Sequence, residues 1–172
     1  MMGGSERLPW DESIMVEVEF GVYPEEETCT SADYSPQIKI VGLKAPYLAI
    51  IMDDPDAEMG GFTHWTIWNI PKTGLIPRNI PKRGDVEEPI HALQGRNSYG
   101  KIGYSGPCPP EGEEHTYVFR IYGLDGPLDL NHSSTRKDLE KKMVGHILQY
   151  GQVEIKFRRM DPVAIGREKS VS

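Results

Sequence analysis

The chain has 172 residues, of which 38% are hydrophobic and 26% charged, and these values predict one soluble globular domain with a single core. Its 26 acidic and 19 basic residues give a formal net charge of −7, which disfavours binding to nucleic acid or to an anionic membrane surface. No stretch approaches the ~18 apolar residues of a membrane span, and none reads as a secretory signal, so we expect a cytoplasmic protein without integral membrane association.

The first half of the chain predicts strands joined by polar connections. Apolar and polar residues alternate from Ile14 to Phe20, which is the period of a half-buried strand. The polar segment 24–35 is rich in turn-forming residues and predicts a surface loop. Further strands are expected at residues 37–41, 47–54 and 63–70. Residues 1–12, ahead of the first strand, are expected to be flexible.

A tract rich in proline and glycine separates these strands from the rest of the chain. It runs from residue 71 to residue 110, and a loop of this length in a compact domain is usually functional. Residues 115–122 then alternate as a strand, and residues 152–158 predict a closing strand. Residues 161–172 are expected to be flexible.

One helix is predicted near the end of the chain. Thr135 and Asp138 have the spacing of a capping box, and apolar residues continue at helical spacing as far as Tyr150. Gly151 stands where a glycine commonly ends a helix. Because strands far outnumber helices, the chain predicts a mainly β, antiparallel fold with one or two peripheral helices.

Carboxylates and histidines gather at the ends of the predicted strands. Asp54 ends one strand and His64 lies at the start of the next, so the short turn between them brings the two side chains close together. Alternation predicts that His64 shares a face with Thr66 and Trp68. On the later strand His115 and Tyr117 share a face. If the three strands are neighbours, Asp54, His64, His115 and Tyr117 meet at one end of the sheet.

Such a cluster is compatible with several kinds of chemistry. Each histidine can be an ordinary interior residue, or two histidines and one carboxylate can bind a metal ion. Ser98 or Ser105 can serve as a nucleophile with His115 as base and Asp54 as its orienting group, although no Gly-x-Ser-x-Gly elbow supports this. Imidazoles, a phenol and backbone amides also suit an anion such as phosphate, because a carboxylate raises the pKa of a neighbouring histidine. We favour the anion pocket, with no catalytic residue, metal or cofactor.

Two further features bear on function. The segment from Gly95 to Lys101 has the glycine and lysine spacing of a phosphate-binding loop, but Ile102 replaces the magnesium-binding Ser or Thr. We therefore expect only a tight loop that contributes to a pocket. Cys29 and Cys108 are the only cysteines, and although they can pair, free thiols are the expectation for a cytoplasmic chain.

Several of these motifs, in this order, resemble the phosphatidylethanolamine-binding protein family, most closely its short bacterial and archaeal branch. The motifs are Asp54-Pro55-Asp56-Ala57, Thr63-His64-Trp65, Asn69-Ile70-Pro71, Tyr104-Ser105-Gly106-Pro107 and residues 115–122. The resemblance spans about residues 14–158, which would form a single domain. It implies a large antiparallel sheet packed on a smaller sheet, with one or two peripheral helices.

The resemblance also implies a ligand and a site. The ligand would be a small anion (phosphate, acetate or a phosphoethanolamine-like head group) held by a non-enzymatic protein. Carried over by position, the ligand-binding residues would be Asp54, Asp56, Phe62, His64, Gly106, Pro107, His115 and Tyr117.

Family members are also described as kinase-pathway modulators and serine-protease inhibitors. The alternative is therefore a protein that regulates a protease or kinase through an exposed loop such as residues 71–89, and a hydrolase is a third hypothesis. A homodimer is compatible with the apolar content of the long loop.

The chain departs from the family pattern at two places. Glu58 stands where the family usually has a proline after the Asp-Pro-Asp-Ala run, so this turn is expected to be looser. The sequence continues for only a short distance after its last predicted strand, without the C-terminal helix of the animal members. The resemblance therefore implies a more open site here.

Overall fold

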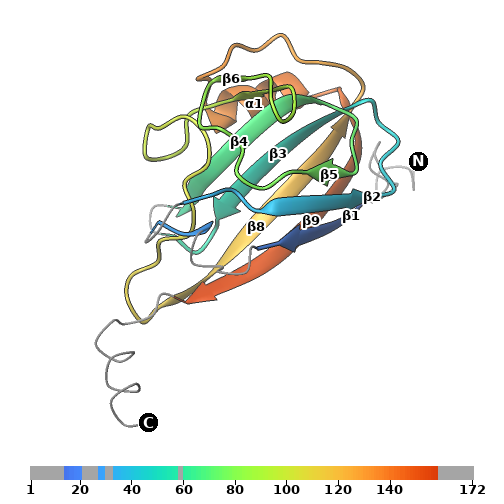
Figure 1. Ribbon diagram of the computed structural model, residues 1–172. Helices are drawn as coiled ribbons and strands as arrows, with labels where there is room; N and C mark the ends of the chain where they lie inside the picture. The colour runs from blue at the N-terminus through green and yellow to red at the C-terminus, as the bar shows by residue number, and fades with distance from the viewer. Residues whose placement is uncertain (1–13, 21–26, 30–32, 58–59, 159–172) are drawn as a thin grey trace, which may run out of the picture.

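The structure is a computed structural model that describes residues 14–20, 27–29, 33–57 and 60–158. The expectations for residues 1–12, Glu58 and residues 161–172, and for residues 24–26 and 30–32 of the predicted surface loop, fall outside the described residues. Among those described, two antiparallel sheets and one helix are present (Figure 1). None of the described helices is long and apolar enough to span a membrane.

The predicted fold class is confirmed, with a large sheet packed against a small one. The large sheet has the strand order β6-β7-β4-β3-β8-β9, the small sheet has the order β1-β2-β5, and all paired strands are antiparallel. The strands are β1 (Met15–Glu19), β2 (Gln37–Val41), β3 (Tyr47–Asp54), β4 (Phe62–Pro71), β5 (Leu75–Ile76), β6 (Asp85–Val86), β7 (Ala92–Gln94), β8 (Glu114–Leu124) and β9 (Ile147–Arg158).

The central strand β3 is buried on both faces, which explains its uninterrupted apolar run. Leu48, Ile50 and Met52 point into the core between the two sheets, together with residues of the small sheet such as Ile38. The intervening residues Ala49 and Ile51 point into a second cluster on the opposite face, which the helix α1 (Arg136–Met143) covers. The molecule thus has three layers, with the small sheet in front of the large one and the helix behind it in Figure 1.

Helix α1 begins as predicted but ends earlier. Thr135 caps it, with both hydrogen bonds of the capping box to Asp138. The predicted continuation to Tyr150 is wrong, because the chain leaves the helix after Met143 and enters β9 at Ile147. From Ile147 onward the chain pairs with β8 along the whole length of that strand, and this pairing overrides the local preference for a helix that the apolar spacing indicates. Gly151 is therefore no helix end: it lies in β9, where a Cβ atom would collide with the carbonyl oxygen of Ile14.

The tract from residue 71 to residue 110 is less irregular than predicted. It contributes the short strands β5, β6 and β7 to the two sheets. Ile76, Ile80 and Val86 within it are buried in the core between the sheets. Its prolines and glycines keep each strand to two or three residues, so the tract covers the core as a series of anchored turns.

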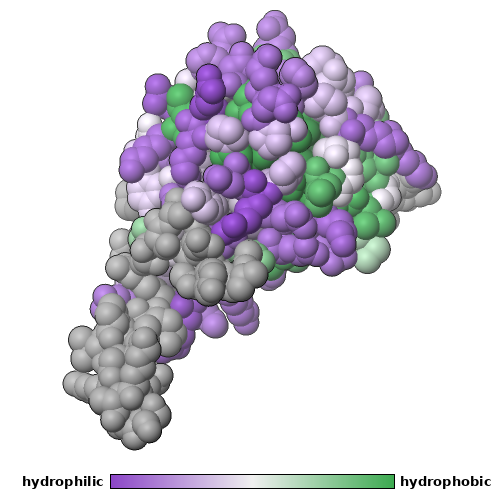
Figure 2. Space-filling view, viewed as in Figure 1, coloured by the Kyte–Doolittle hydropathy of each residue, from purple (hydrophilic) through white to green (hydrophobic). Residues whose placement is uncertain are grey.

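The outer face of the small sheet is exposed, as one face of an antiparallel sheet commonly is. Figure 2 shows that this side of the molecule is largely hydrophilic, with an apolar area among the polar side chains. Met15 and Val41, which are paired across β1 and β2, and Leu75 on β5 are exposed apolar residues of this sheet. A homodimer stays a prediction.

An ion-pair network fastens α1 to the large sheet. The carboxylate of Asp53, at the end of β3, is 2.6 Å from Nη1 of Arg136 on the helix and 3.3 Å from Nε of Arg120 on β8. The Asp53 side chain is only 7% exposed, whereas the two arginines are about a quarter exposed (25% and 28%). Removing the carboxylate would leave two partly buried cations without their shared partner.

We expect the Asp53→Asn substitution to lower the free energy of unfolding by about 2 kcal/mol, because the amide cannot neutralise either arginine. Urea unfolding followed by circular dichroism measures this loss. Glu140→Gln is the matched control, since Glu140 pairs with the same Arg136 on the exposed helix surface, and it should cost less than about 0.5 kcal/mol. Equal losses in the two variants would contradict the role given to Asp53.

Candidate functional site

A pocket opens where β3, β4 and β8 meet at one end of the large sheet. Its volume is about 380 Å³, which suits a small molecule. The lining residues are Asp54, Asp56, Ala57, Phe62, His64, Tyr99, Cys108, Pro109, Pro110, Glu113, His115 and Tyr117. They come from three strands, the Asp-Pro-Asp turn, the loop that carries Tyr99 and the segment 108–113 that leads into β8.

The structure brings together most of the ligand-binding residues expected from the sequence. Six of the eight line the pocket, namely Asp54, Asp56, Phe62, His64, His115 and Tyr117. Gly106 and Pro107 are not among the lining residues. Sequence reasoning missed Glu113 and Tyr99, although Tyr99 lies in the glycine-rich loop that was expected to reach a pocket. The assignment of all these residues to a ligand stays a prediction.

A register shift between β3 and β4 places His64. Met52 pairs with Trp65 and the next residue, Asp53, pairs with Thr63, so His64 is the extra residue on β4. An extra residue of this kind is a β-bulge, and it changes the direction in which the side chains of the strand point. The expected sharing of one face by His64, Thr66 and Trp68 is therefore wrong: Trp68 lies in the cluster under the helix, whereas the His64 ring lies 5.3 Å from the ring of Tyr117.

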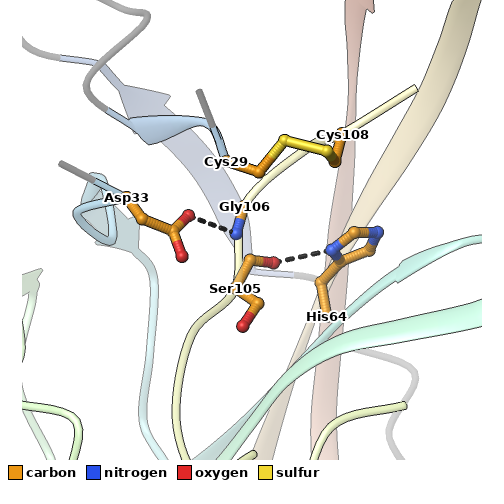
Figure 3. Close-up of a disulfide and its surroundings, with 6 residues drawn as sticks. All are labelled: Cys29, Asp33, His64, Ser105, Gly106 and Cys108. Carbon is orange, nitrogen blue, oxygen red and sulfur yellow. Dashed lines mark hydrogen bonds between the residues drawn. A yellow bond between two sulfur atoms is a disulfide. The ribbon is translucent and has the colours of Figure 1, made fainter. Parts of the chain in front are cut away.

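His64 is buried and neutral. Its side chain is only 3% exposed, and this burial lowers its pKa from the ordinary value of 6.5. Nδ1 is 2.6 Å from the carbonyl oxygen of Ser105, which can only accept, so the proton of the neutral ring lies on Nδ1 (Figure 3). Nε2 is consequently unprotonated and can accept a hydrogen bond.

His115 is held between two carboxylates. Its Nδ1 lies 2.6 Å from Oδ2 of Asp54 and its Nε2 lies 3.1 Å from Oε1 of Glu113. Hydrogen bonds to Asp54, and then to Glu113, raise the pKa of His115 above the ordinary value of 6.5. Both N–H groups of the imidazolium therefore point at protein carboxylates.

The Asp-Pro-Asp turn is organised by its own carboxylates. Oδ1 of Asp54 accepts a hydrogen bond of 2.8 Å from the backbone N–H of Asp56, which closes the turn. The carboxylate of Asp56 in turn accepts from the N–H of Thr116 on β8, at 3.2 Å. The pocket carries a net negative charge, because it has three carboxylates (Asp54, Asp56 and Glu113) and only one imidazolium (His115).

Aromatic rings form the side of the pocket. Phe62 lies 4.8 Å from His64 and 4.6 Å from Tyr99, measured between ring centroids. The loop that carries Tyr99 is fastened to β4 because the backbone of Ser98 donates to the Thr63 carbonyl oxygen. Burial, and then the charge of Asp54, raises the pKa of Tyr117, so its hydroxyl keeps its proton.

Gly106 and Pro107 stand behind the pocket wall. The N–H of Gly106 donates to Oδ1 of Asp33 at 2.7 Å, away from the lining residues (Figure 3). A Cβ atom at Gly106 would collide with the carbonyl oxygen of Glu27, so glycine is required for close packing of two backbones. The Ser-Gly-Pro motif therefore shapes the wall through packing.

The expectation of free thiols is wrong. Cys29 and Cys108 form a disulfide whose Cα atoms lie 5.4 Å apart (Figure 3). The fold places the two segments side by side, since the N–H of Cys29 donates to the carbonyl oxygen of Pro107 at 3.2 Å, and this proximity is invisible in a sequence separation of 79. Disulfides persist in oxidising compartments and also inside hyperthermophiles, so the cytoplasmic location stays a prediction.

The geometry does not support the serine-nucleophile hypothesis. The hydroxyl of Ser105 accepts from Nδ2 of Asn97 at 3.0 Å, and that of Ser98 accepts from the N–H of Thr63 at 2.8 Å. Neither serine is a lining residue, and His115 is engaged by carboxylates on both nitrogens. Within the described ranges, no group of three His, Cys, Asp or Glu residues is placed to hold a metal ion.

Comparison with known proteins gives consistent matches. Residues 17–158 match the model of the family described as phosphatidylethanolamine-binding protein. A UPF0098 protein of Pyrococcus horikoshii is 49% identical over 157 residues, covering 88% of this chain and 77% of its own. A UPF0098 protein of Pyrococcus abyssi is 49% identical over 154 residues, covering 88% and 85%.

Solved structures agree with this match. The crystal structure of the homologue CT736 from Chlamydia trachomatis, described as related to phosphatidylethanolamine-binding proteins, has a TM-score of 0.72 at 26% identity and covers 86% of this chain and 98% of its own. YbcL from Escherichia coli, described as a new member of the mammalian PEBP family, also has a TM-score of 0.72, at 24% identity, covering 85% and 97%. The second likeness shows a shared fold.

Removing the disulfide by Cys29→Ala together with Cys108→Ala should lower the free energy of unfolding by about 2–4 kcal/mol, because the cross-link restricts the unfolded chain. Urea unfolding with and without a dithiol reductant measures this effect. The reductant should destabilise the unmodified protein by a similar amount and leave the double variant unchanged. If the urea midpoint of the unmodified protein were the same with and without the reductant, the structural role of the disulfide would be contradicted.

Replacing Glu113 by Gln should lower the pKa of His115 toward its ordinary value of 6.5, because a neutral amide oxygen favours the imidazolium less than the carboxylate that it replaces. A raised histidine pKa stabilises the fold below pH 6.5, and this contribution is lost as the pH rises through the folded-state pKa. NMR titration of the ring protons gives the pKa directly. Glu111→Gln, on the exposed turn nearby, should leave His115 unchanged, and an equal shift in both variants would rule out the specific contact.

Proposed function

Because the chain belongs to the phosphatidylethanolamine-binding protein family, we propose that it is a non-enzymatic binding protein that holds a small phosphoryl anion in this pocket. The observation that carries the proposal is the convergence of Asp54, His64, His115 and Tyr117 from three neighbouring strands on one cavity. A phosphate or phosphoethanolamine-like head group fits a cavity of about 380 Å³.

Several contacts support a site that holds an anion. The Tyr117 hydroxyl keeps its proton and can donate it to a ligand oxygen. His115 supplies the one positive charge in the pocket, and an anion that competes with Glu113 for Nε2 can accept from it. Phe62 and Tyr99 provide apolar surface for the carbon atoms of an organic phosphate.

The groups that surround the cavity support binding of the anion without catalysis. Both serine hydroxyls that were considered as nucleophiles accept hydrogen bonds from other parts of the chain. The two histidines are fixed by a backbone carbonyl and by carboxylates, so neither is aligned with a hydroxyl nucleophile. Regulation of a protease or kinase through residues 71–89 stays a prediction from the resemblance alone.

Titration with inorganic phosphate should shift the ring signals of both His64 and His115 in NMR spectra, because the bound anion lies beside both rings. His64→Ala or His115→Ala should weaken binding by about tenfold or more, through the loss of a hydrogen bond to a charged ligand. His132→Ala, on an exposed loop outside the pocket, should bind phosphate like the unmodified protein. Binding that survives both pocket substitutions would place the anion elsewhere.

A further inference from the structure

The stretch 105–110, of which Cys108, Pro109 and Pro110 line the pocket, offers no uncommitted N–H group. The N–H of Ser105 donates to the carbonyl oxygen of His64 at 3.1 Å, and that of Gly106 donates to Asp33 at 2.7 Å. The N–H of Cys108 donates to the Tyr117 hydroxyl oxygen. The other three residues of this fully described stretch are Pro107, Pro109 and Pro110, which have no N–H group. An anion therefore finds no backbone donor here.

The side chains that face the cavity are also mostly acceptors. His64 on β4 presents the unprotonated Nε2, and β3 and its turn present the carboxylates of Asp54 and Asp56. β8 and the loop before it contribute Glu113, together with His115, whose two N–H groups are directed at carboxylates. Among the lining groups, the phenol hydroxyls of Tyr99 and Tyr117 are the remaining titratable donors, and only that of Tyr117 is buried.

We infer that the pocket selects oxyanions that carry their own proton, namely phosphate monoesters bound as the monoanion, over phosphate diesters of the same charge. The inference rests on the proposed function and names its ligand class. The P–OH group of a monoester donates to Nε2 of His64 while an anionic oxygen of the same phosphate accepts from the Tyr117 hydroxyl. This pairing satisfies the acceptor of His64 and the donor of Tyr117 at once.

A phosphate diester cannot make this pair of contacts. It has no P–OH group, so its oxygens would face the lone pair of His64 unless the ring took a proton from solvent. Burial opposes that protonation, since it lowers the pKa of His64. A membrane phospholipid is a diester, so the pocket favours a free phosphorylated small molecule over a lipid head group.

The proton that accompanies the ligand makes binding depend on pH. The second pKa of a phosphate monoester is about 6, so above this pH the dianion predominates in solution. Forming the monoanionic complex then takes up one proton per ligand bound. The association constant should accordingly fall by up to tenfold for each pH unit above about pH 6.

Isothermal titration calorimetry with three matched ligands tests the inference. Phosphoethanolamine is a monoester, glycerophosphoethanolamine is the corresponding diester, and ethanolamine has the amine alone. At about pH 6, where the monoanion is abundant, phosphoethanolamine should bind about tenfold or more tightly than the diester, and ethanolamine should not bind measurably. At about pH 8, two buffers of different ionisation enthalpy should report uptake of about one proton with phosphoethanolamine.

The possible outcomes separate this inference from the proposed function. Equal affinities for monoester and diester would overturn the selectivity and leave an anion-binding pocket in place. Binding of ethanolamine as tight as that of phosphoethanolamine would overturn both, because the negative pocket would then be an amine site. No binding of any ligand, or of inorganic phosphate, would overturn the proposed function and the inference with it.

A substitution locates the selectivity. His64→Gln presents an amide that can donate as well as accept, so the monoester-to-diester affinity ratio should fall to about threefold or less, even if both affinities weaken. His91→Gln, at an exposed position outside the pocket, is the matched control and should keep the ratio of the unmodified protein. A folded His64→Gln variant with an unchanged ratio would overturn the role given to Nε2 of His64.

Discussion

The last two residues of β3 are both aspartates, and the alternation of the strand sends their carboxylates to opposite faces of the large sheet. Asp53 faces the helix layer and neutralises Arg120 and Arg136, which fastens α1. Asp54 faces the layer between the sheets, where it closes the turn to Asp56 and holds His115. Each carboxylate is almost fully buried, and burial is tolerated because each is paired. The end of the central strand thus anchors both the scaffold and the pocket.

The pocket that results is unusual for a site expected to take an anion. The backbone N–H groups of residues 105–110 are used internally, and the carboxylates of the pocket outnumber its cations. Such a site gains affinity less from charge attraction than from matching each acceptor with a donor on the ligand. The same arrangement explains why the two histidines differ: burial lowers the pKa of His64, whereas hydrogen bonds to Asp54 and then Glu113 raise the pKa of His115.

The wall opposite the strands depends on contacts between segments that are far apart in the chain. The disulfide joins Cys29 to Cys108, the carboxylate of Asp33 holds the N–H of Gly106, and the hydroxyl of Tyr104 donates to the carbonyl oxygen of Glu27. Through Ser105 this wall also orients the imidazole of His64. Covalent and hydrogen-bonded contacts therefore link Cys29 and Asp33 to the stretch that orients His64 (Figure 3).

Local alternation and short motifs in the sequence determined the mainly β class, most strand positions, the cap at Thr135 and the meeting of Asp54, His64, His115 and Tyr117, because they record burial and turns directly. The packing of two sheets and the pocket positions of Asp56 and Phe62 were implied by the resemblance to the family. The tertiary structure alone decided the rest. Pairing with β8 converted the predicted end of the helix into β9, and the register shift in β4 turned His64 away from the face of Trp68. The disulfide and the use of the Gly106 N–H by Asp33 both depend on contacts between distant chain segments. A pattern of side-chain types along one chain contains no signal for such contacts, because they form only once strands and loops pack together.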